Sequence, residues 1–241
     1  MSGHLYSGFS AKVRWFVKRF GARELVFLPV RIILSRLVTP FLQRRCFTFH
    51  EHEFEYFYAH YNVTWCNERC VEVPIGRDYL KRFIGREVLE VGNVLSHYGA
   101  SSHGVLDKYE RGHSIVNADI VDYQPDRPPD LILSLSTFEH IGFDDDAEGS
   151  SGEKIQAAIA ACRRLLAPGG LLAFTVPLGY NPDLDRLIEQ DALGQDRGWF
   201  LLRRGTRDWA EASRGDALGT AYGRPFPYAN ALFIAEYDAP A

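Results

Sequence analysis

The chain has 241 residues, of which 46% are hydrophobic and 13% aromatic, so enough apolar side chains are present to bury a core, and general disorder is excluded. The net charge of −4 is unevenly divided: residues 1–50 carry nine basic side chains and one acidic one, a net +8, so the rest carries −12. The basic residues lie on apolar helical segments and the remainder is acidic, which argues against an enzyme that acts on RNA or DNA.

Residues 1–64 are predicted to form a basic amphipathic helical extension with an aromatic connector, and residues 65–241 a separate domain. Apolar residues recur at helical spacing around 13–20 and 33–41. Arg31 and Arg36 interrupt the second run, which leaves it short of the roughly 18 uncharged residues that span a membrane. Two interpretations stay open: residues 12–45 make peripheral contact with an anionic membrane, or the helices simply cover the domain.

The aromatic connector at 47–65, FTFHEHEFEYFYAHYNVTW, alternates in part and is predicted to be a strand or hairpin. The cysteines and histidines at 46–70 match neither a C-x-x-C nor an H-x-x-x-H pair, so no metal site is predicted. The chain's four cysteines do not suit a disulfide framework at this length, and no secretory signal is evident. We therefore expect a cytoplasmic protein, peripheral to the inner membrane face if the extension binds lipid.

From residue 71 onward, apolar runs alternate with helical patterns, which is typical of an α/β fold with a mostly parallel sheet flanked by helices. The clearest helix is predicted over 153–167, where the sequence PGG ends it and turns the chain into a strand. Seven strands are predicted in one Rossmann-like sheet, at residues 87–91, 103–107, 114–118, 130–135, 170–176, 199–203 and 230–237.

The loop after the first of these strands, in VLEVGNVLSH at 88–97, has a single glycine, Gly92. A dinucleotide site uses G-x-G-x-x-G because its pyrophosphate must lie against backbone amides at a helix N-terminus. Bulky residues follow Gly92 up to Gly99, so a pyrophosphate would fit badly. S-adenosylmethionine has no phosphate, and one glycine suffices where its methionyl part crosses the strand.

The ribose diol and the adenine amine of such a cofactor each need a hydrogen-bond acceptor, for which a carboxylate is well suited. Asp107 ends the second strand and is predicted to bind the ribose hydroxyls, and Asp119 follows the third strand and is predicted to bind the adenine amine. Each Asp alone could equally be a helix cap or a turn residue. Their placement in series at strand ends favours the cofactor site.

Five segments together resemble a class I S-adenosylmethionine-dependent methyltransferase, of the bacterial and archaeal branch whose first loop reads E-V-G-N: VLEVGNVLSHYG, VLDKYE, VNADIVDY, DLILSLSTFEHIG and LLAPGGLLAFTVP. The resemblance covers residues 65–237. It implies a methyltransferase that binds S-adenosylmethionine. It places on the cofactor the residues Glu90, Gly92, Asn93, Asp107, Asp119, Ile120 and Ser134.

Two departures from the family pattern bear on the site. The first loop lacks the G-x-G-x-G of many members, and the spacings of 17 residues from Glu90 to Asp107 and 12 from Asp107 to Asp119 are short. We expect brief or irregular helices between these strands. Glu110 is an alternative to Asp107 at the ribose.

Methyl transfer is an in-line displacement, and a hydroxyl acceptor also benefits from a general base, whereas a neutral amine does not need one. Glu139 and His140 follow the fourth strand, where such a base is expected. We favour His140, whose ordinary pKa is near neutrality, with a structural role for either residue as the alternative. Glu68 and Arg69, just before the first strand, are candidates for closing over the cofactor or holding the acceptor.

These features predict a methyltransferase that acts on a small molecule or a glycan precursor, with oxygen favoured as the methyl acceptor. Residues 178–229 are expected to shape the acceptor pocket. Two other classes remain as alternatives: an NAD(P)-dependent oxidoreductase with a Rossmann domain, and a binding module that holds S-adenosylmethionine without catalysis.

Overall fold

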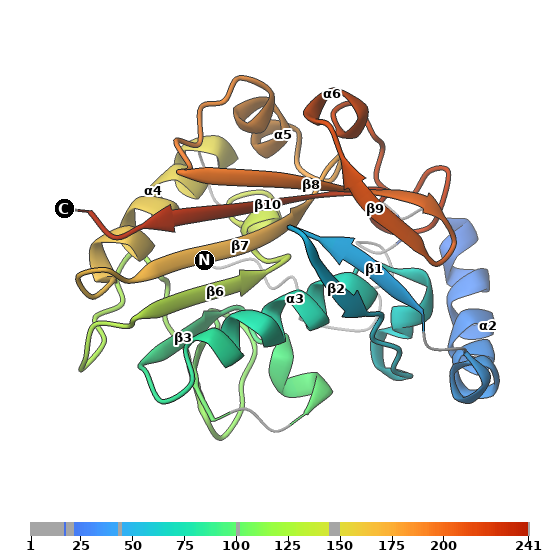
Figure 1. Cartoon of the computed structure of the whole chain (residues 1–241), viewed down its shortest axis with the longest axis horizontal. Helices are drawn as coiled ribbons and strands as arrows, with labels where there is room; N and C mark the ends of the chain where they lie inside the picture. Colours follow the sequence, from blue (N-terminus) through green and yellow to red (C-terminus); the bar gives the residue numbers. More distant parts are fainter. Residues whose placement is uncertain (1–16, 18–21, 43–44, 100–101, 145–149, 241) are drawn as a thin grey trace.

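The computed structural model describes residues 17, 22–42, 45–99, 102–144 and 150–240. Within them, eight strands form the main sheet (Figure 1). Their spatial order is β5 (Ile115–Val116), β4 (Gly104–Leu106), β3 (Val88–Val91), β6 (Leu131–Leu135), β7 (Leu171–Pro177), β10 (Ala231–Asp238), β8 (Arg197–Gly205) and β9 (Asp208–Ala212). The first five are mutually parallel, and β10 is antiparallel to both β7 and β8.

This sheet confirms the predicted Rossmann-like, mostly parallel α/β fold, and all seven predicted strands are present. The predicted count of seven was one too low. The additional strand, β9, has the sequence DWAEA and pairs with β8 alone at the edge of the sheet. Apart from Trp209, its residues are alanine, aspartate and glutamate, which are depleted in strands. The local sequence pattern therefore gave no signal for β9.

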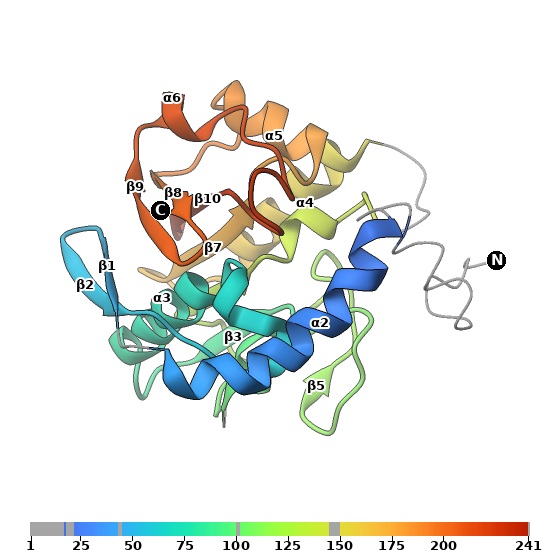
Figure 2. The same ribbon diagram turned by 90° about the vertical axis from the view of Figure 1, so that its right-hand side faces the viewer.

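Helices cover both faces of the sheet (Figures 1 and 2). One face packs against α4 (Ser151–Leu165) and α5 (Pro182–Glu189), and the other against α3 (Arg69–Arg82). Strand β6 contributes Leu131, Leu133 and Leu135 to one core and Ile132 to the other, as the alternation of side chains along a strand requires. Because β6 is buried on both faces, its sequence LILSL is almost continuously apolar.

Helix α4 lies where the sequence predicts a helix at 153–167. Ile155, Ile159 and Cys162 recur at helical spacing and are all buried against the sheet. Arg163 and Arg164 occupy its last turn, where positive charge interacts favourably with the helix dipole.

Helix α3 was not predicted, because Pro74 and Gly76 lie within it and both disfavour helices. Pro74 has no N–H to bond the carbonyl of Cys70, and this carbonyl instead accepts a hydrogen bond of 2.9 Å from Phe57 N. At Gly76, a Cβ would lie 2.8 Å from a methyl carbon of Leu135. Glycine thus allows the helix to lie close against β6.

Before the domain, α2 (Ala22–Val38) and η1 (Thr39–Phe41) contain the second apolar run of the extension. The predicted helix around 13–20 lies outside the described residues, apart from residue 17. Strands β1 (Cys46–Phe49) and β2 (His52–Glu55) form an antiparallel hairpin, which confirms the predicted strand or hairpin. None of the described helices is long and apolar enough to cross a membrane.

Candidate active site

The strand order reverses between β3 and β6: the chain continues from β3 outward to β4 and β5, and then returns to place β6 on the other side of β3. In open α/β sheets, ligands bind beyond the carboxyl ends of the strands at such a switch point. The loop after β3 contains Gly92, and the turn η4 (Phe138–His140) follows β6. Most of the predicted site residues lie on these two segments or on the loops after β4 and β5.

Gly92 has a positive φ of 86°, which favours glycine. A Cβ at this position would also lie 2.1 Å from the hydroxyl oxygen of Thr137, far inside any permitted contact. Thr137 donates its hydroxyl hydrogen to the carbonyl of Leu135, at 3.2 Å. The single glycine therefore lets the loop after β3 fit against the turn after β6.

Glu90, at the end of β3, is completely buried. One carboxylate oxygen accepts hydrogen bonds from the amides of Val94 and Leu95, at 3.0 and 2.8 Å, and the other lies 2.6 Å from Nε2 of His103. Both oxygens are thus engaged within the protein. In this structure Glu90 holds the first loop in shape.

Asp107, at the carboxyl end of β4, ties two loops together. Its Oδ1 accepts hydrogen bonds from the amides of Tyr109 and Glu110, at 2.8 and 2.7 Å, and its Oδ2 accepts one of 3.1 Å from the amide of Asn93. The side chain of Asn93 in turn donates to Glu110 Oε1, at 2.8 Å. The side chain of Glu110 is 41% exposed, so this acidic group is accessible from solvent.

The rings of His97 and Tyr61 border these loops. His97 Nε2 lies 3.1 Å from Glu110 Oε1, and its ring stacks on that of Tyr61 with centroids 4.7 Å apart. Tyr61 belongs to η2 (Tyr61–Cys66), which precedes α3. The Asn93–Glu110 pair thus lies beside an aromatic surface that the sequence did not predict.

Asp119 follows β5 and is half-buried. Its carboxylate forms an ion pair of 2.9 Å with Lys108 Nζ and accepts a hydrogen bond from the amide of Val121. Burial opposes ionisation, but these bonds outweigh it and lower the pKa of Asp119. Ile120 is buried in the core with Leu106. Asp119 is therefore an anion at the predicted adenine position.

Ser134, in the middle of β6, is completely buried. Its hydroxyl donates a hydrogen bond of 2.8 Å to the carbonyl of Val91 on the neighbouring strand. This hydrogen bond joins β6 to β3. The contact of Ser134 with the cofactor stays a prediction.

Glu68 and Arg69 lie at the start of α3, and both side chains are largely withdrawn from solvent. Arg69 donates to Glu72 Oε2, at 2.7 Å, and to the carbonyl of Leu135, at 3.2 Å. Glu68 is 7% exposed, and its Oε2 accepts a hydrogen bond from the amide of Ala229. Burial and the neighbouring Glu72 raise the pKa of Glu68.

Glu72 is the most deeply placed member of this cluster and was missed in the sequence. It is completely buried, and its Oε1 accepts hydrogen bonds from the hydroxyls of Ser136 and Thr175. Arg69 and Glu72 are three residues apart on a helix, a spacing that brings side chains together, but a helix had not been predicted there. The cluster links α3 to the carboxyl ends of β6 and β7.

On the turn after β6, Glu139 and His140 lie side by side. Glu139 Oε1 is 3.5 Å from His140 Nε2, whereas Glu139 Oε2 is buried with no hydrogen-bond partner in the described part of the chain. Burial raises the pKa of Glu139 to about 7. Both residues lie on a short 3-10 turn, Phe138–His140.

The other ring nitrogen of His140 is held by two residues that sequence reasoning missed. Nδ1 contacts Asp144 Oδ2, and the hydroxyl of Tyr180 lies 3.0 Å from Nδ1 and 2.7 Å from the Asp144 carboxylate. Burial would lower the pKa of His140, but Glu139 and Asp144 outweigh it and raise that pKa. The His140 side chain remains 45% exposed. It is an accessible imidazole between two carboxyl groups.

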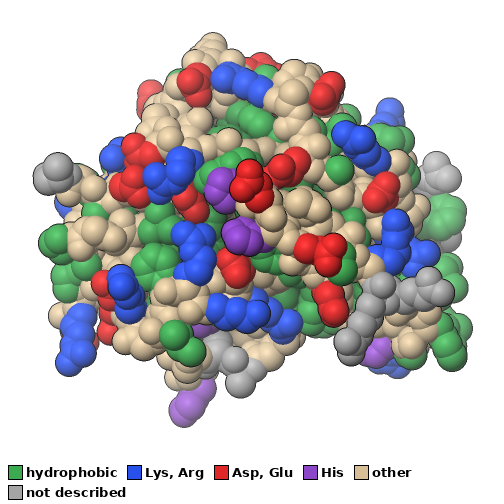
Figure 3. Space-filling view, viewed as in Figure 1, with side chains coloured by type: hydrophobic (Ala, Val, Ile, Leu, Met, Phe, Trp, Pro, Cys, Tyr) green, Lys and Arg blue, Asp and Glu red, His purple; other side chains and the backbone are tan. Residues whose placement is uncertain are grey.

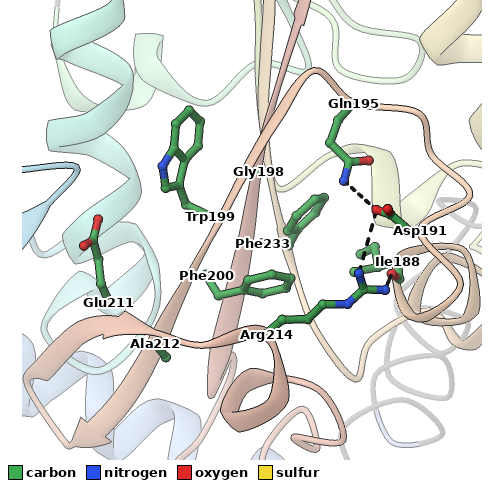
Figure 4. Close-up of a pocket in the computed structure, with 10 residues that line it drawn as sticks. All are labelled: Ile188, Asp191, Gln195, Gly198, Trp199, Phe200, Glu211, Ala212, Arg214 and Phe233. Carbon is green, nitrogen blue, oxygen red and sulfur yellow. Dashed lines mark hydrogen bonds and ion pairs between the residues drawn. The ribbon is translucent and has the colours of Figure 1, made fainter.

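Two surface hollows lie away from this site. One, of about 390 Å³, lies between β8, β9 and the segment after α5, with Trp199, Phe200 and Phe233 among its lining residues (Figure 4). Asp191 there bonds to Gln195 and pairs with Arg214, at 3.1 and 3.8 Å. The other, of about 530 Å³, lies beside α4. All the residues that line the first hollow except Phe233 fall within 178–229, the range predicted to shape the acceptor pocket. None of the individually predicted site residues lines either hollow.

In the described residues, no group of three or more His, Cys, Asp or Glu side chains has the geometry of a metal site. None of the four cysteines, Cys46, Cys66, Cys70 and Cys162, all of which the structure describes, forms a disulfide, and the last three are buried.

No family model matches the chain, and no curated protein matches it. Some solved methyltransferase structures are distantly similar. The N-methyltransferase NodS from Bradyrhizobium japonicum, in complex with S-adenosyl-L-homocysteine, has 14% identity and a TM-score of 0.41 over 72% of this chain and 92% of its own. A methyltransferase from Archaeoglobus fulgidus has 15% identity and a TM-score of 0.41 over 66% and 90%. CalS10, an amino pentose methyltransferase from Micromonospora echinaspora, has 17% identity and a TM-score of 0.35 over 49% and 56%.

Proposed function

We propose that the chain is a class I S-adenosylmethionine-dependent methyltransferase of the branch with an E-V-G-N first loop, acting on a small molecule or a glycan precursor. One relationship carries this proposal. The single-glycine loop after β3 lies against the turn after β6 that bears Glu139 and His140, so a cofactor crossing Gly92 would have an acid–base pair beside it. Two of the five motifs that resemble the family, VLEVGNVLSHYG and DLILSLSTFEHIG, lie on these segments.

The polar groups at the strand ends fit the parts of S-adenosylmethionine. Glu110, which is accessible, and Asp107, which shapes the loop, would hold the ribose diol. The ionised Asp119 would accept from the adenine amine, with Ile120 beside it. The loop with Asn93 would lie along the methionyl part. When bound, the cofactor would supply an electrophilic methyl group on its sulfonium.

The acceptor would be a hydroxyl, and His140 would be its general base. Asp144 and Tyr180 hold Nδ1, which leaves Nε2 as the ring nitrogen that takes the acceptor proton. Glu139 Oε1, at 3.5 Å from Nε2, would stabilise the imidazolium that results. Glu68 and Arg69, at the same end of the sheet, are proposed to border the acceptor.

Heat protection distinguishes this function from the two alternatives. S-adenosylhomocysteine is expected to raise the thermal midpoint of the protein, and NAD and NADP are not. Stabilisation by a dinucleotide alone would instead indicate an oxidoreductase. Stabilisation by S-adenosylhomocysteine without methyl transfer to any of a panel of hydroxyl and amine acceptors would indicate a binding module.

The acceptor atom can be tested with His140→Gln once an acceptor is found. For a hydroxyl acceptor, loss of the base should lower kcat by about 100-fold or more and remove the rise of rate with pH through the pKa of His140. Asp122→Asn, an exposed substitution beyond β5, is the control. An unchanged kcat with an amine acceptor would overturn the oxygen assignment while leaving the methyltransferase assignment intact.

We also propose that the protein works in the cytoplasm. None of its four cysteines, which all lie in the described part of the chain, forms a disulfide, and burial raises the pKa of Cys162 to about 12, which keeps this thiol protonated and unreactive. A cell fractionation that found the protein outside the cytoplasmic compartment would contradict this.

A further inference from the structure

Helix α2 presents its apolar side chains away from the domain. Val30, Ile33, Leu34, Leu37 and Phe41 recur at helical spacing along α2 and η1, and all five are exposed; Leu37 is 62% exposed and Phe41 85%. Figure 3 shows hydrophobic side chains along the edge of the molecule over α2. We call these five residues the outer stripe.

The side of α2 that faces the domain is polar by comparison. Ser35 is completely buried, its hydroxyl lies 3.4 Å from that of Thr39, and its carbonyl lies 3.4 Å from His60 Nδ1. Arg31 places its guanidinium over the ring of Tyr228. A helix of a water-soluble domain normally turns its apolar face to the core, so this arrangement is inverted. The outer stripe is therefore suited to contact with another apolar surface, outside the domain.

The charge of the extension indicates which apolar surface the outer stripe contacts. Residues 1–50 carry a net charge of +8, and Arg36 and Arg45 are exposed on α2 and just beyond η1. Pairing of two copies through the outer stripe would bring two segments of +8 together, which is unfavourable. An anionic lipid surface accepts both the apolar side chains and the positive charge.

We propose that α2 and η1 bind the surface of an anionic membrane, with the outer stripe inserted among the lipids and the arginines at the headgroups. Because α2 crosses the carboxyl edge of the sheet (Figure 2), the bound protein would hold its candidate site toward the lipid. The lipid contact itself does not depend on the proposed methyl transfer. Its failure would leave that function standing.

The test is flotation of the full chain with vesicles of phosphatidylcholine alone and of phosphatidylcholine mixed with phosphatidylglycerol. We expect binding to the mixed vesicles only, and weaker binding as salt is raised. The double variant Leu37→Ser, Phe41→Ser should lose about tenfold or more in vesicle affinity, and Arg36→Gln about fivefold. Ile84→Ser, which replaces an equally exposed apolar residue outside the extension, should bind as the unaltered protein does.

Two other occupants of the outer stripe give different results. If a second copy covers it, light scattering should show a dimer that the double variant dissociates. If residues 1–21 cover it, the double variant should lower the thermal midpoint in the absence of lipid. Each of these two results would overturn the proposal. So would unchanged flotation of the double variant, or no binding of the unaltered protein to the mixed vesicles.

Discussion

Thr137 occupies the space that a side chain at Gly92 would need: an ideal Cβ there would lie 2.1 Å from its hydroxyl oxygen. Gly92→Ala should therefore combine the cost of a positive φ with overpacking, a loss of about 2–4 kcal/mol in the free energy of unfolding. Chemical denaturation measures this loss. Substitution at a site without the clash should cost less.

Gly85→Ala is the matched control, because Gly85 has a similar φ of 77° and no atom within 4 Å of its ideal Cβ. It should cost about 1 kcal/mol. Thr137→Ala should recover part of the loss in the Gly92→Ala background. Equal losses for the two glycine variants would show that the contact with Thr137 does not constrain the loop.

Substitutions of Glu110 and Asp107 should distinguish a role in cofactor binding from a role in loop stability. Glu110→Ala should weaken S-adenosylhomocysteine binding by about tenfold or more, because a charged acceptor is lost, with little change in thermal midpoint. Asp107→Ala should lower both the affinity for S-adenosylhomocysteine and the thermal midpoint, since the carboxylate of Asp107 accepts hydrogen bonds from three backbone amides. A Glu110→Ala variant with full affinity would assign the ribose to Asp107 alone.

The raised pKa of Glu139 predicts a dependence of stability on pH. The folded carboxyl, with its pKa of about 7 against 4.5 ordinarily, holds its proton where the unfolded one has lost it. Stability therefore falls as pH rises from about 4.5 to about 7, by an amount on the order of 3 kcal/mol.

Glu139→Gln should remove this decline, so its stability relative to the unaltered protein should increase between these two pH values. Denaturation at a series of pH values measures it, with the exposed Glu153→Gln as the control. A parallel pH dependence in both proteins would mean that Glu139 is already ionised near neutrality.

Arg69 and Glu72 form a buried pair, and removing one partner leaves the other charge uncompensated. Arg69→Met should cost about 3–5 kcal/mol, and Arg69→Met with Glu72→Met should recover much of that. Arg186→Met, which breaks the exposed pair with Asp183, should cost at most about 1 kcal/mol. Similar losses for the two single arginine variants would contradict the burial of the Arg69 pair.

Strands of the sheet could be predicted because they are buried, as in LILSL, and local apolar pattern reports burial. Helix α3 could not be predicted, because Pro74 disfavours a helix and the hydrogen bond from Phe57 N that satisfies the carbonyl of Cys70 does not show in the local sequence. The partners of Glu72 lie 64 and 103 residues away, at Ser136 and Thr175. Such contacts depend on tertiary structure.

The same distinction applies to the candidate site. The motifs marked the strand ends and the turn with Glu139 and His140, because these follow directly from where strands stop. Asp144 lies only four residues beyond His140, so its contact with the ring is local in sequence. Tyr180 comes from beyond β7, and only the fold brings it to His140. Nor did the sequence indicate the hydrogen bond that the hydroxyl of Ser134 donates to the carbonyl of Val91.

The most direct test is a calorimetric titration of the intact protein with S-adenosylmethionine and S-adenosylhomocysteine, beside Glu110→Ala and Asp119→Ala. We predict saturable binding of both compounds in the micromolar range, weakened by each substitution. No binding to the folded, intact protein would contradict the assignment, and the fit of Gly92 against Thr137 would then serve the packing of the sheet alone.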